Sequence, residues 1–463
     1  MVSSVSAKAD SGHQIGQQDY SYHSIYRAFA PLLERWGQTT EVTRPESRLD
    51  YALWRARQQG LEPVHISFLP LHSLYLTSHA RNVAFTLWGL PDIPNEDIGN
   101  NPRNNLMRIA NHVSLILTAS TFARNAFIRA GVKSPVHTVP VPVRSAYFAV
   151  SDWVRDQQVI LECPAYWIPQ PQLENPSGQK LSTHSRWPSV QKRAKNFYGA
   201  YVKSHLPRRI AQLLTSAAGA GASMQNADDE NRVSYSVSSS LRLSGVVYTA
   251  FVNPFDPTMN WEDMLSAYLL ALQGREDATL VIKLVVSSDD AARGVNRVVH
   301  YYESLGLRHL CKLAVIPGQL SDAQLVELTR GSTYYLNTSR AEGACLPLQE
   351  SLAAGRPAIS PNHTAMADYF HDQLGFLVAS HPEPARWPHD PERRCVSTWH
   401  RLVWQSLYDQ IQASYEMAKG NTQAYQALAS HARNQMFNFA SVERVWTLLS
   451  AALDSIIEGR GEH

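Results

Sequence analysis

Two glutamates eight residues apart carry the clearest chemical signal of the sequence, in the stretch YYLNTSRAEGACLPLQESLAAGRPAI. Glu342 falls in a polar loop after the strand-like YYLN, and Glu350 falls about one turn into a helix that should begin near Leu346 or Pro347. The start of a helix offers free N–H groups and a positive dipole end to a phosphate. Carboxylates accept hydrogen bonds from sugar or ribose hydroxyls. The stretch therefore predicts a site for a phosphorylated sugar or nucleotide.

This stretch resembles the donor-site signature of the large retaining glycosyltransferase family with the GT-B fold (group 1, family four), which reads E-G-x-x-x-P-x-x-E followed by A-x-G-x-P. The alternative is an ordinary strand–loop–helix unit with two solvated glutamates. The resemblance implies an α/β chain of two doubly wound, Rossmann-like domains facing each other across a cleft, with a C-terminal helix that crosses back. It also implies transfer of a hexose from a nucleotide-sugar to a glycan or lipid-linked acceptor, with retention, in polysaccharide or cell-surface glycan biosynthesis.

The resemblance also assigns roles to residues. Glu342 would contact the donor sugar as the candidate catalytic residue, and Glu350 would bind the ribose hydroxyls. The leaving phosphate acts as the base in transfers of this kind, so no protein nucleophile is needed. The loop that would present N–H groups to the diphosphate consists of Gly343, Ala344, Cys345, Leu346, Pro347 and Leu348. Further donor-site candidates are Asn253, after a strand, and the strand end Ile316–Pro317, whose backbone would line the base pocket.

The chain departs from the family pattern where the diphosphate is usually held by an arginine and a lysine. The matching positions, in VNPFDPTMNWEDML, are Pro254 and Met259. Lys283 and Arg340 are candidates to replace the lost cations. Lys283 lies in the apolar run VIKLVV, and a buried lysine needs a partner, whereas a lysine on an edge strand would face solvent.

The missing cations leave other functions open. One alternative is a glycosyltransferase-like binding or scaffold protein that has lost turnover. Another is a sugar-phosphate epimerase on the same two-domain fold, which would need acid and base carboxylates on opposite sides of the cleft.

The first half of the chain offers weaker candidates for the acceptor side. Many family members carry a histidine after a strand near the donor sugar, but the corresponding NVAFTLWGLPDIP has Trp88 and Gly89 there. His72 follows the strand-like VHISF, and DYSYH precedes the first expected helix. The acceptor-side candidates are Asp19, His23, His72 and Trp88.

Composition limits the class of protein. A chain of 463 residues exceeds one compact domain, and a net charge of +2 gives no reason to expect nucleic-acid binding. Four cysteines without a CxxC pair predict free thiols, and no D-x-D motif or cofactor motif is present, so we expect metal independence and no cofactor besides the nucleotide-sugar co-substrate. The polar N-terminus and the lack of a run of ~20 apolar residues predict a cytoplasmic protein.

Apolar periodicity places the supporting elements. In the first half we expect helices at 23–36, 101–113 and 121–131 and strands at 64–68, 82–88, 114–120 and 136–143. In the second half we expect strands at 246–253, 279–286, 310–318, YYLNT and 376–379, and helices at 261–274, 290–306, 321–331 and across 397–457. The expected divisions are a disordered 1–19, an acceptor-side domain 20–150, a linker or insertion 151–244, a nucleotide-sugar domain 245–440 and a crossing helix 441–463.

The expected linker contains prolines, a basic segment at 191–209 and a stretch of small and polar residues at 215–240 that predicts flexibility. The basic segment interleaves lysine and arginine with aromatic residues. It predicts either peripheral contact with anionic lipid on the cytoplasmic membrane face or a solvated helix that packs on the first domain, and we favour the packed helix.

Overall fold

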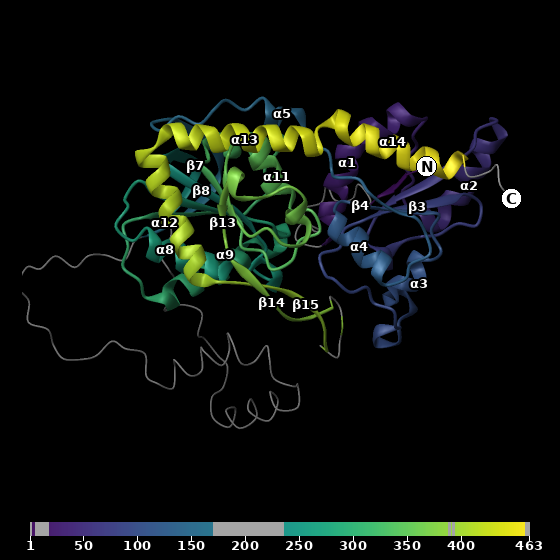
Figure 1. Ribbon diagram of the computed structural model, residues 1–463, viewed down its shortest axis with the longest axis horizontal. Coiled ribbons are helices and arrows are strands. Elements are labelled where there is room, and N and C mark those ends of the chain that lie inside the picture. The colour runs from purple at the N-terminus through teal and green to yellow at the C-terminus, as the bar shows by residue number, and fades with distance from the viewer. Residues whose placement is uncertain (1, 5–17, 170–235, 388–389, 391–393, 459–463) are drawn as a thin grey trace, which may run out of the picture. The chain divides into compact units, whose positions relative to one another are not determined.

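The computed structural model describes residues 2–4, 18–169, 236–387, 390 and 394–458. The first sheet has five strands in the order β1-β2-β3-β4-β5, all parallel (Figure 1). Its strands are β1 (Val2–Ser4), β2 (Val64–Phe68), β3 (Arg81–Thr86), β4 (Leu115–Thr118) and β5 (Val136–Thr138). Its helices are α1 (Gln18–Trp36), α2 (Pro45–Gln58), α3 (Leu106–Ala110), α4 (Thr121–Arg129) and α5 (Ser145–Phe148).

Several elements of this half differ from the sequence prediction. Val2 lies in the expected disordered N-terminus, yet it is buried and pairs with Ile66. Helix α1 begins at Gln18 rather than His23, and α2 was not predicted. The helix expected at 101–113 shrinks to a 3-10 turn (Pro102–Asn104) and α3, because the side chain of Asn105 caps a new helix start by accepting from Arg108 N.

The second sheet has eight strands in the order β13-β12-β11-β8-β9-β10-β6-β7. Its bounds are β6 (Gln158–Ile168), β7 (Ser236–Ser244), β8 (Val246–Val252), β9 (Ala278–Leu284), β10 (Lys312–Ile316), β11 (Tyr334–Leu336), β12 (Ala358–Ser360) and β13 (Gly375–Leu377). Its helices include α8 (Trp261–Ala271), α9 (Ser288–Leu305), α10 (Asp322–Gly331) and α11 (Leu346–Ala353). Strands β8 to β13 pair in parallel, as the alternation of strands and helices predicted.

Strands β6 and β7 correct the expected linker. β6 pairs in antiparallel fashion with β10 on one side and with β7 on the other, so residues 158–168 and 236–244 belong to the second sheet. Buried and exposed residues alternate along β6, as is typical of an antiparallel strand with one solvated face. Ser236–Ser240, expected within the flexible stretch, is part of β7. The basic segment 191–209 lies outside the described residues, so its membrane contact stays a prediction.

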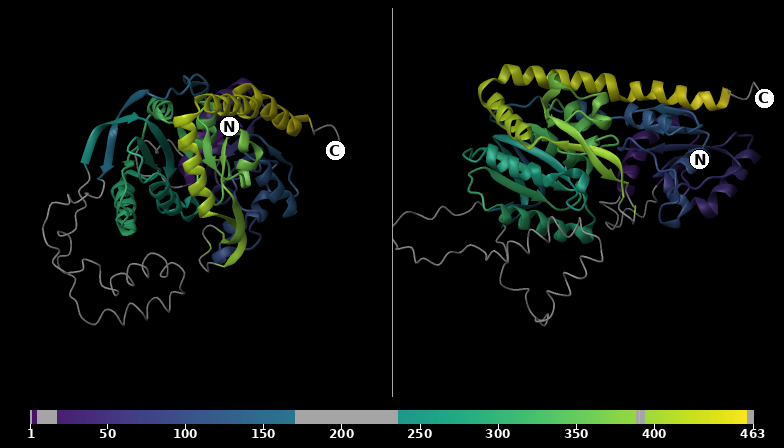
Figure 2. Two further views of the ribbon diagram at one scale, coloured as in Figure 1. Left: turned by 60° about the vertical axis from the view of Figure 1, so that its left-hand side comes forward. Right: turned by 60° about the horizontal axis from the view of Figure 1, so that its bottom comes forward.

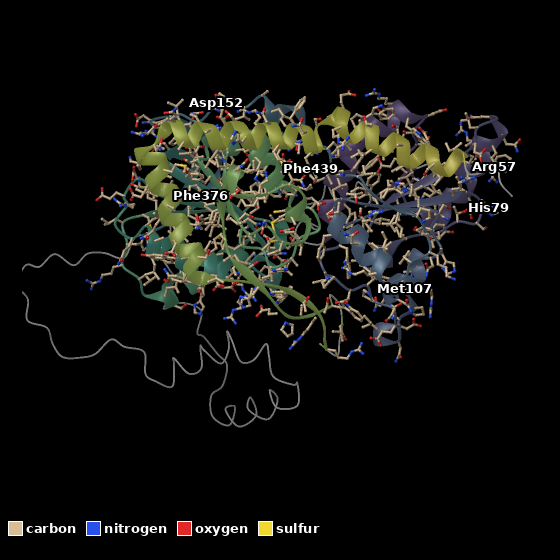
Figure 3. The ribbon with its side chains drawn as sticks, in the orientation of Figure 1. Arg57, His79, Met107, Asp152, Phe376 and Phe439 are labelled. Carbon is tan, nitrogen blue, oxygen red and sulfur yellow. The ribbon has the colours of Figure 1, made fainter. Side chains whose placement is uncertain are left out.

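The C-terminal part begins with a hairpin of β14 (Ser380–Arg386) and β15 (Cys395–Leu402), where a helix was expected from Ser397. Three helices follow, α12 (Trp404–Gly420), α13 (Thr422–Ala440) and α14 (Val442–Glu458), drawn in yellow one after another in Figure 2. Helix α13 contacts the segment between α5 and β6, because Arg433 forms a 2.9 Å ion pair with Asp152, which is labelled in Figure 3. None of the described helices is long and apolar enough to cross a bilayer.

Helix α14 returns to the first sheet, as the fold prediction required. Leu449 and Leu453 are buried in one hydrophobic cluster with Ile25 and Phe29 of α1, next to which Figure 1 shows α14. The trace thus consists of two parallel-sheet domains, the second with an antiparallel edge, and a long C-terminal helix on the first. This confirms the expected GT-B arrangement of elements.

Replacing Leu453 with alanine should lower the free energy of unfolding by about 2–5 kcal/mol, because it removes a fully buried side chain from this core. Ile457→Ala, at a position of the same helix that is 46% exposed, is the matched control and should cost far less. Urea unfolding curves measure both changes. Equal losses would show that α14 does not contribute to the core of the first sheet.

Candidate functional site

The Glu342 loop lies between β11 and α11, at the carboxyl edge of the second sheet. Helix α11 begins at Leu346 with Pro347 in its first turn, as the sequence predicted. Cys345 precedes it in a left-handed conformation with φ 57°. This turn directs the chain from the loop into the helix.

Hydrogen bonds among its own side chains hold the Glu342 loop. The amide nitrogen of Asn337 donates to Ser360 Oγ (3.0 Å) and Met366 Sδ (2.9 Å), which directs Asn337 Oδ1 towards Ser339. The Ser339 hydroxyl lies 2.8 Å from Asn337 Oδ1 and 2.7 Å from Glu342 Oε1. The backbone N–H of Glu342 donates to Thr364 Oγ1 at 3.1 Å.

This arrangement favours a neutral Glu342. The Ser339 hydroxyl has one proton, and both of its neighbours are acceptors when Glu342 is ionised. A protonated Glu342 can donate to Ser339, which can then donate to Asn337. Burial raises the pKa of Glu342 to about 7, and the Asp256 carboxylate adds to the rise, whereas hydrogen bonds from Ser339 and Cys345 oppose it.

The same loop packs directly on the end of β3. A methyl group added at Gly343 would lie 2.9 Å from Leu87 Cβ and 3.1 Å from the backbone nitrogen of Trp88. A methyl group at Gly89 would lie 3.0 Å from the backbone of Glu342. The structure therefore brings Trp88, proposed for the acceptor side, next to the Glu342 loop, and a side chain at either position would press on the facing residues.

Glu350 is paired with an arginine that the sequence did not single out. Arg144 Nη2 lies 3.3 Å from Glu350 Oε1, and Arg144 Nη1 lies 2.7 Å from Asp322 Oδ1. Arg27 of α1 reaches the same aspartate at 3.0 Å. Burial raises the pKa of Glu350, and Arg144 and a hydrogen bond from Tyr147 act against this rise. The sequence could have pointed to Arg144 as a site residue, because it directly follows the apolar run VHTVPVPV.

Lys283 is a buried cation in the middle of the second sheet. It lies near the carboxyl end of β9, in register with Phe251 of β8 and Ile316 of β10, and is 6% exposed. The alternative of an edge-strand lysine facing solvent is therefore wrong. Its Nζ donates to the Leu284 carbonyl at 2.8 Å, and burial lowers its pKa to about 8. No carboxylate pairs with it in the described part of the chain.

Arg340 is held within the protein. Its guanidinium pairs with Glu383 at 2.5 Å and donates to Asn260 Oδ1 at 2.9 Å. These contacts pair the guanidinium charge of Arg340 that we expected to bind a diphosphate. Arg340 is therefore already paired within the protein, and Lys283, which no described carboxylate pairs, is the better candidate to meet an anionic ligand.

The remaining donor-site candidates lie at the same edge of the second sheet. Asn253 follows β8 and its Oδ1 accepts from Phe255 N at 3.0 Å, while Ile316 ends β10 and Pro317 follows it. Pro254 and Met259 lie in the loop between β8 and α8, and the Met259 carbonyl accepts from Thr338 Oγ1 at 3.0 Å. In the loop where the cations were expected, the structure places the carboxylate of Asp256, which raises the pKa of Glu342.

The acceptor-side candidates are more scattered. Asp19 and His23 lie within α1 instead of a loop before it. The side chain of Asp19 is outside the described part of the chain. The Nδ1 atom of His23 is buried and has no hydrogen-bond partner among the described residues. His72 lies in a 3-10 turn (Leu71–Ser73), and its carbonyl accepts from Arg103 at 3.4 Å. Trp88 Nε1 donates to the Asp92 carbonyl at 3.1 Å.

A histidine pair beside the Glu342 loop was also missed. His363 is 6% exposed, its Nδ1 lies 3.3 Å from Thr364 Oγ1, and its ring stacks on His400 with 4.1 Å between centroids. Burial, followed by the neighbouring His400, lowers the pKa of His363 to about 3, so the ring stays neutral. The two residues are 37 positions apart in the sequence, and their pairing depends on a hairpin that the sequence pattern did not reveal.

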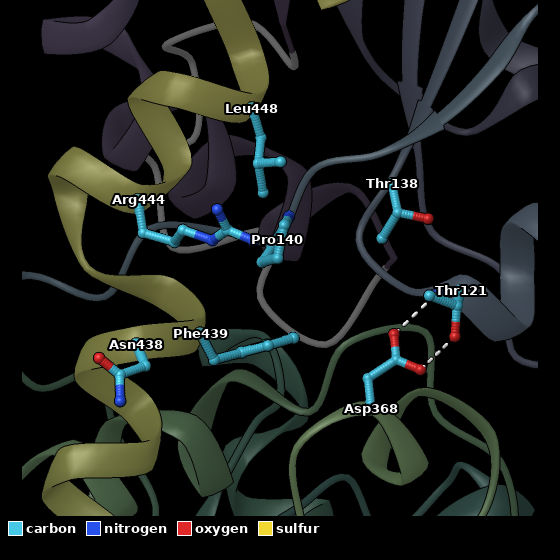
Figure 4. A pocket seen from close by; sticks show the side chains of 8 residues that line it. All are labelled: Thr121, Thr138, Pro140, Asp368, Asn438, Phe439, Arg444 and Leu448. Atoms are coloured by element: carbon cyan, nitrogen blue, oxygen red, sulfur yellow. Dashed lines mark hydrogen bonds between the residues drawn. The ribbon is translucent and has the colours of Figure 1, made fainter.

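A cavity of about 320 Å³ lies beside the start of α4 (Figure 4). Asp368 occupies the start of α4 beside it, since its carboxylate accepts from the backbone N–H of Thr121 at 2.6 Å and from the Thr121 hydroxyl. Its lining consists of Thr121, Thr138, Pro140, Asp368, Asn438, Phe439, Arg444 and Leu448. None of the sequence-derived candidates lines it, so we do not assign the donor to it.

The side chains of three of the four cysteines are described by the structure. Cys163, Cys311 and Cys345 are buried, unpaired thiols in the described part of the chain. No group of three or more histidine, cysteine, aspartate or glutamate side chains with metal-binding geometry occurs among the described residues.

Gly343→Ala should lower the free energy of unfolding by about 1–3 kcal/mol, because its methyl group would press on Leu87 and Trp88. Gly318→Ala, where an added methyl group meets nothing within 4 Å, is the control. Thermal unfolding measures both. A Gly343→Ala protein as stable as the control would show that the Glu342 loop does not pack on β3 in solution.

Glu342→Gln should flatten the pH dependence of stability between about pH 5 and about pH 8. The folded pKa of about 7 lies above the ordinary 4.5, so the stabilisation is complete below the lower value and is lost as pH rises through about 7. Urea midpoints across this range give the slope, with exposed Glu276→Gln as control. A slope unchanged by Glu342→Gln would contradict a neutral, buried carboxyl group.

Comparison with known proteins adds little beyond the trace of the chain. No protein-family model and no curated protein matches the sequence. Among solved structures, HepE from Anabaena in complex with UDP and glucose is 15% identical, with 92% of this chain and 89% of that chain covered and a TM-score of 0.47. A glycosyltransferase from Rickettsia africae is 10% identical (92% and 85% covered, TM-score 0.48), and the trehalose-6-phosphate synthase OtsA is 11% identical (97% and 83%, TM-score 0.47). All three TM-scores lie below 0.5, so these structures carry no argument about the function of this chain.

Proposed function

We propose that this protein is a glycosyltransferase that moves a hexose from a nucleotide-sugar to a hydroxyl group of a glycan or lipid-linked acceptor, with retention and without a metal cofactor. The bond between the anomeric carbon and the diphosphate oxygen breaks, and the anomeric carbon bonds to the acceptor oxygen. The acceptor proton passes to the leaving diphosphate. No covalent bond to the protein forms.

The buried ammonium of Lys283 is the observation that carries this proposal. Ligands of open parallel sheets bind beyond the carboxyl ends of the strands, and Lys283 lies near that end of β9 beside Ile316. A buried cation without a carboxylate partner is costly unless an anionic group joins it. A nucleotide diphosphate would supply that group, and the start of α11 would add N–H donors.

The two glutamates take separate roles in the proposal. Glu350, with Arg144 on one oxygen, would accept from a ribose hydroxyl. Glu342, whose Oε1 contacts Ser339, would present its other oxygen to a hydroxyl of the donor sugar. A neutral Glu342 would add no negative charge beside the diphosphate.

A binding protein without turnover is the second candidate, and a specific observation favours it. The β8–α8 loop carries Asp256 and lacks the arginine and lysine of the family pattern, so a diphosphate placed there would meet a carboxylate. The epimerase alternative has less support, because Glu342 and Glu350 belong to one loop–helix unit instead of facing each other from two domains.

Wild-type protein should be stabilised in a thermal-shift screen by one class among UDP-, GDP-, ADP- and TDP-sugars, and should slowly release the free nucleotide. Lys283→Met should weaken that binding by about 10-fold or more, because it removes a charged hydrogen bond, whereas Lys283→Arg should retain part of it. Wild-type affinity should also fall as pH rises through about 8, where Lys283 loses its proton, and Lys283→Met should show no such fall.

The outcomes separate the two functions. Binding with nucleotide release supports the transferase, and binding without release supports the binding protein. If no nucleotide-sugar binds, or if Lys283→Met binds as tightly as wild type, the assignment of Lys283 to the diphosphate is wrong.

A further inference from the structure

The hairpin of β14 and β15 lies outside both large sheets, and its two strands pair only with each other among the described strands. Its described residues contact both the Glu342 loop and the first sheet domain, so it connects two parts of the site that come from distant stretches of the chain.

On one side the hairpin holds the Glu342 loop. Glu383 of β14 pairs with Arg340 at 2.5 Å and accepts from Trp399 Nε1 at 2.7 Å on the same oxygen. The backbone N–H of His400 donates to the Arg340 carbonyl at 2.9 Å. Arg340 is two residues before Glu342, so these contacts fix the start of the loop.

The stacked histidines give a second connection to the loop. The His400 ring of β15 covers the buried ring of His363. The next residue, Thr364, accepts the backbone N–H of Glu342. Thr364 has a left-handed conformation with φ 51°, which is unfavourable for a β-branched residue and needs support from its surroundings.

On the other side the hairpin is fastened to the loop that follows β3. Ser397 Oγ donates to Asp92 Oδ2 at 2.9 Å, and Arg394 pairs with Glu96 at 2.9 Å. A hydrophobic cluster completes this contact. Its members are Leu90 and Ile98 with Ala385 and Trp387, and partly buried Trp88, Ala341 and Trp399.

We propose that the β14–β15 hairpin positions the Glu342 loop, and that it does so through its attachment to the first domain at Asp92 and Glu96. Glu383 and His400 are thus positioning residues for the donor site. Because the hairpin contacts both domains, loosening it on the first domain also loosens Arg340 and Glu342. The consequence for catalysis rests on the proposed function, but the mechanical connection does not.

Hydrogen–deuterium exchange of the ligand-free full chain tests the connection. In Ser397→Ala and Asp92→Ala proteins, which lack the donor and the acceptor of this hydrogen bond, the backbone amides of Arg340 and Glu342 should exchange about fivefold faster than in wild type, although neither substitution touches them. Thr398→Ala, at an exposed position between Ser397 and Trp399, is the matched control and should leave exchange unchanged. Asp92→Ala lies on the first domain and keeps the hairpin sequence intact, so it guards against misfolding of the hairpin itself.

Two results would overturn the proposal. One is unchanged exchange at Arg340 and Glu342 in both proteins, and the other is equal acceleration in Thr398→Ala. A kinetic measurement then uses the donor found in the nucleotide screen. Asp92→Ala should lower kcat for nucleotide release with little change in KM, because the donor contacts remain and their alignment is lost. A failed nucleotide screen would leave the exchange result valid, so the two proposals fail independently.

Discussion

The contact between two stretches of backbone determines the geometry of the site. Gly89 packs on the backbone of Glu342, and Gly343 packs on Leu87 and Trp88, so closely that a methyl group at either glycine would lie within about 3 Å of the facing residue. This contact removes water from one side of the Glu342 loop, and desolvation of the carboxyl group raises the pKa of Glu342. The Ser339 hydroxyl then lies 2.7 Å from the Glu342 Oε1 oxygen.

Burial moves the two central titratable groups towards the uncharged state. The pKa of Glu342 rises to about 7 and that of Lys283 falls to about 8, so both groups change protonation near neutral pH. Arg340 and Arg144, in contrast, are paired with carboxylates. In the proposed donor site, Lys283 is a cation that no carboxylate of the described residues neutralises, and a nucleotide diphosphate would supply the counter-charge.

The sequence predicted what depends on local patterns. The apolar run at 64–68 matches β2, and the start of α11 at Leu346 follows from the position of Pro347. Such local patterns could not predict contacts between residues that are far apart in the sequence. SHPEPAR has two prolines and reads as a loop, but it forms β14 because β15 pairs with it. Likewise the pairing of Arg144 with Glu350 depends on the path of the chain after β5, and Lys283 could be placed on a central strand only once the strand order was known.

The core of the first sheet joins Val2 and residues of α1 to Leu453 and Ile456 of α14 in one hydrophobic cluster. During synthesis on the ribosome, the N-terminal strands and helices would emerge long before α14. At typical elongation rates, the roughly 300 residues between β5 and α14 take roughly 15–60 s to make. Throughout that time the apolar face of α1 would be uncovered and open to chaperones or to aggregation. The crossing helix thus delays completion of the first domain until the second domain has been synthesised.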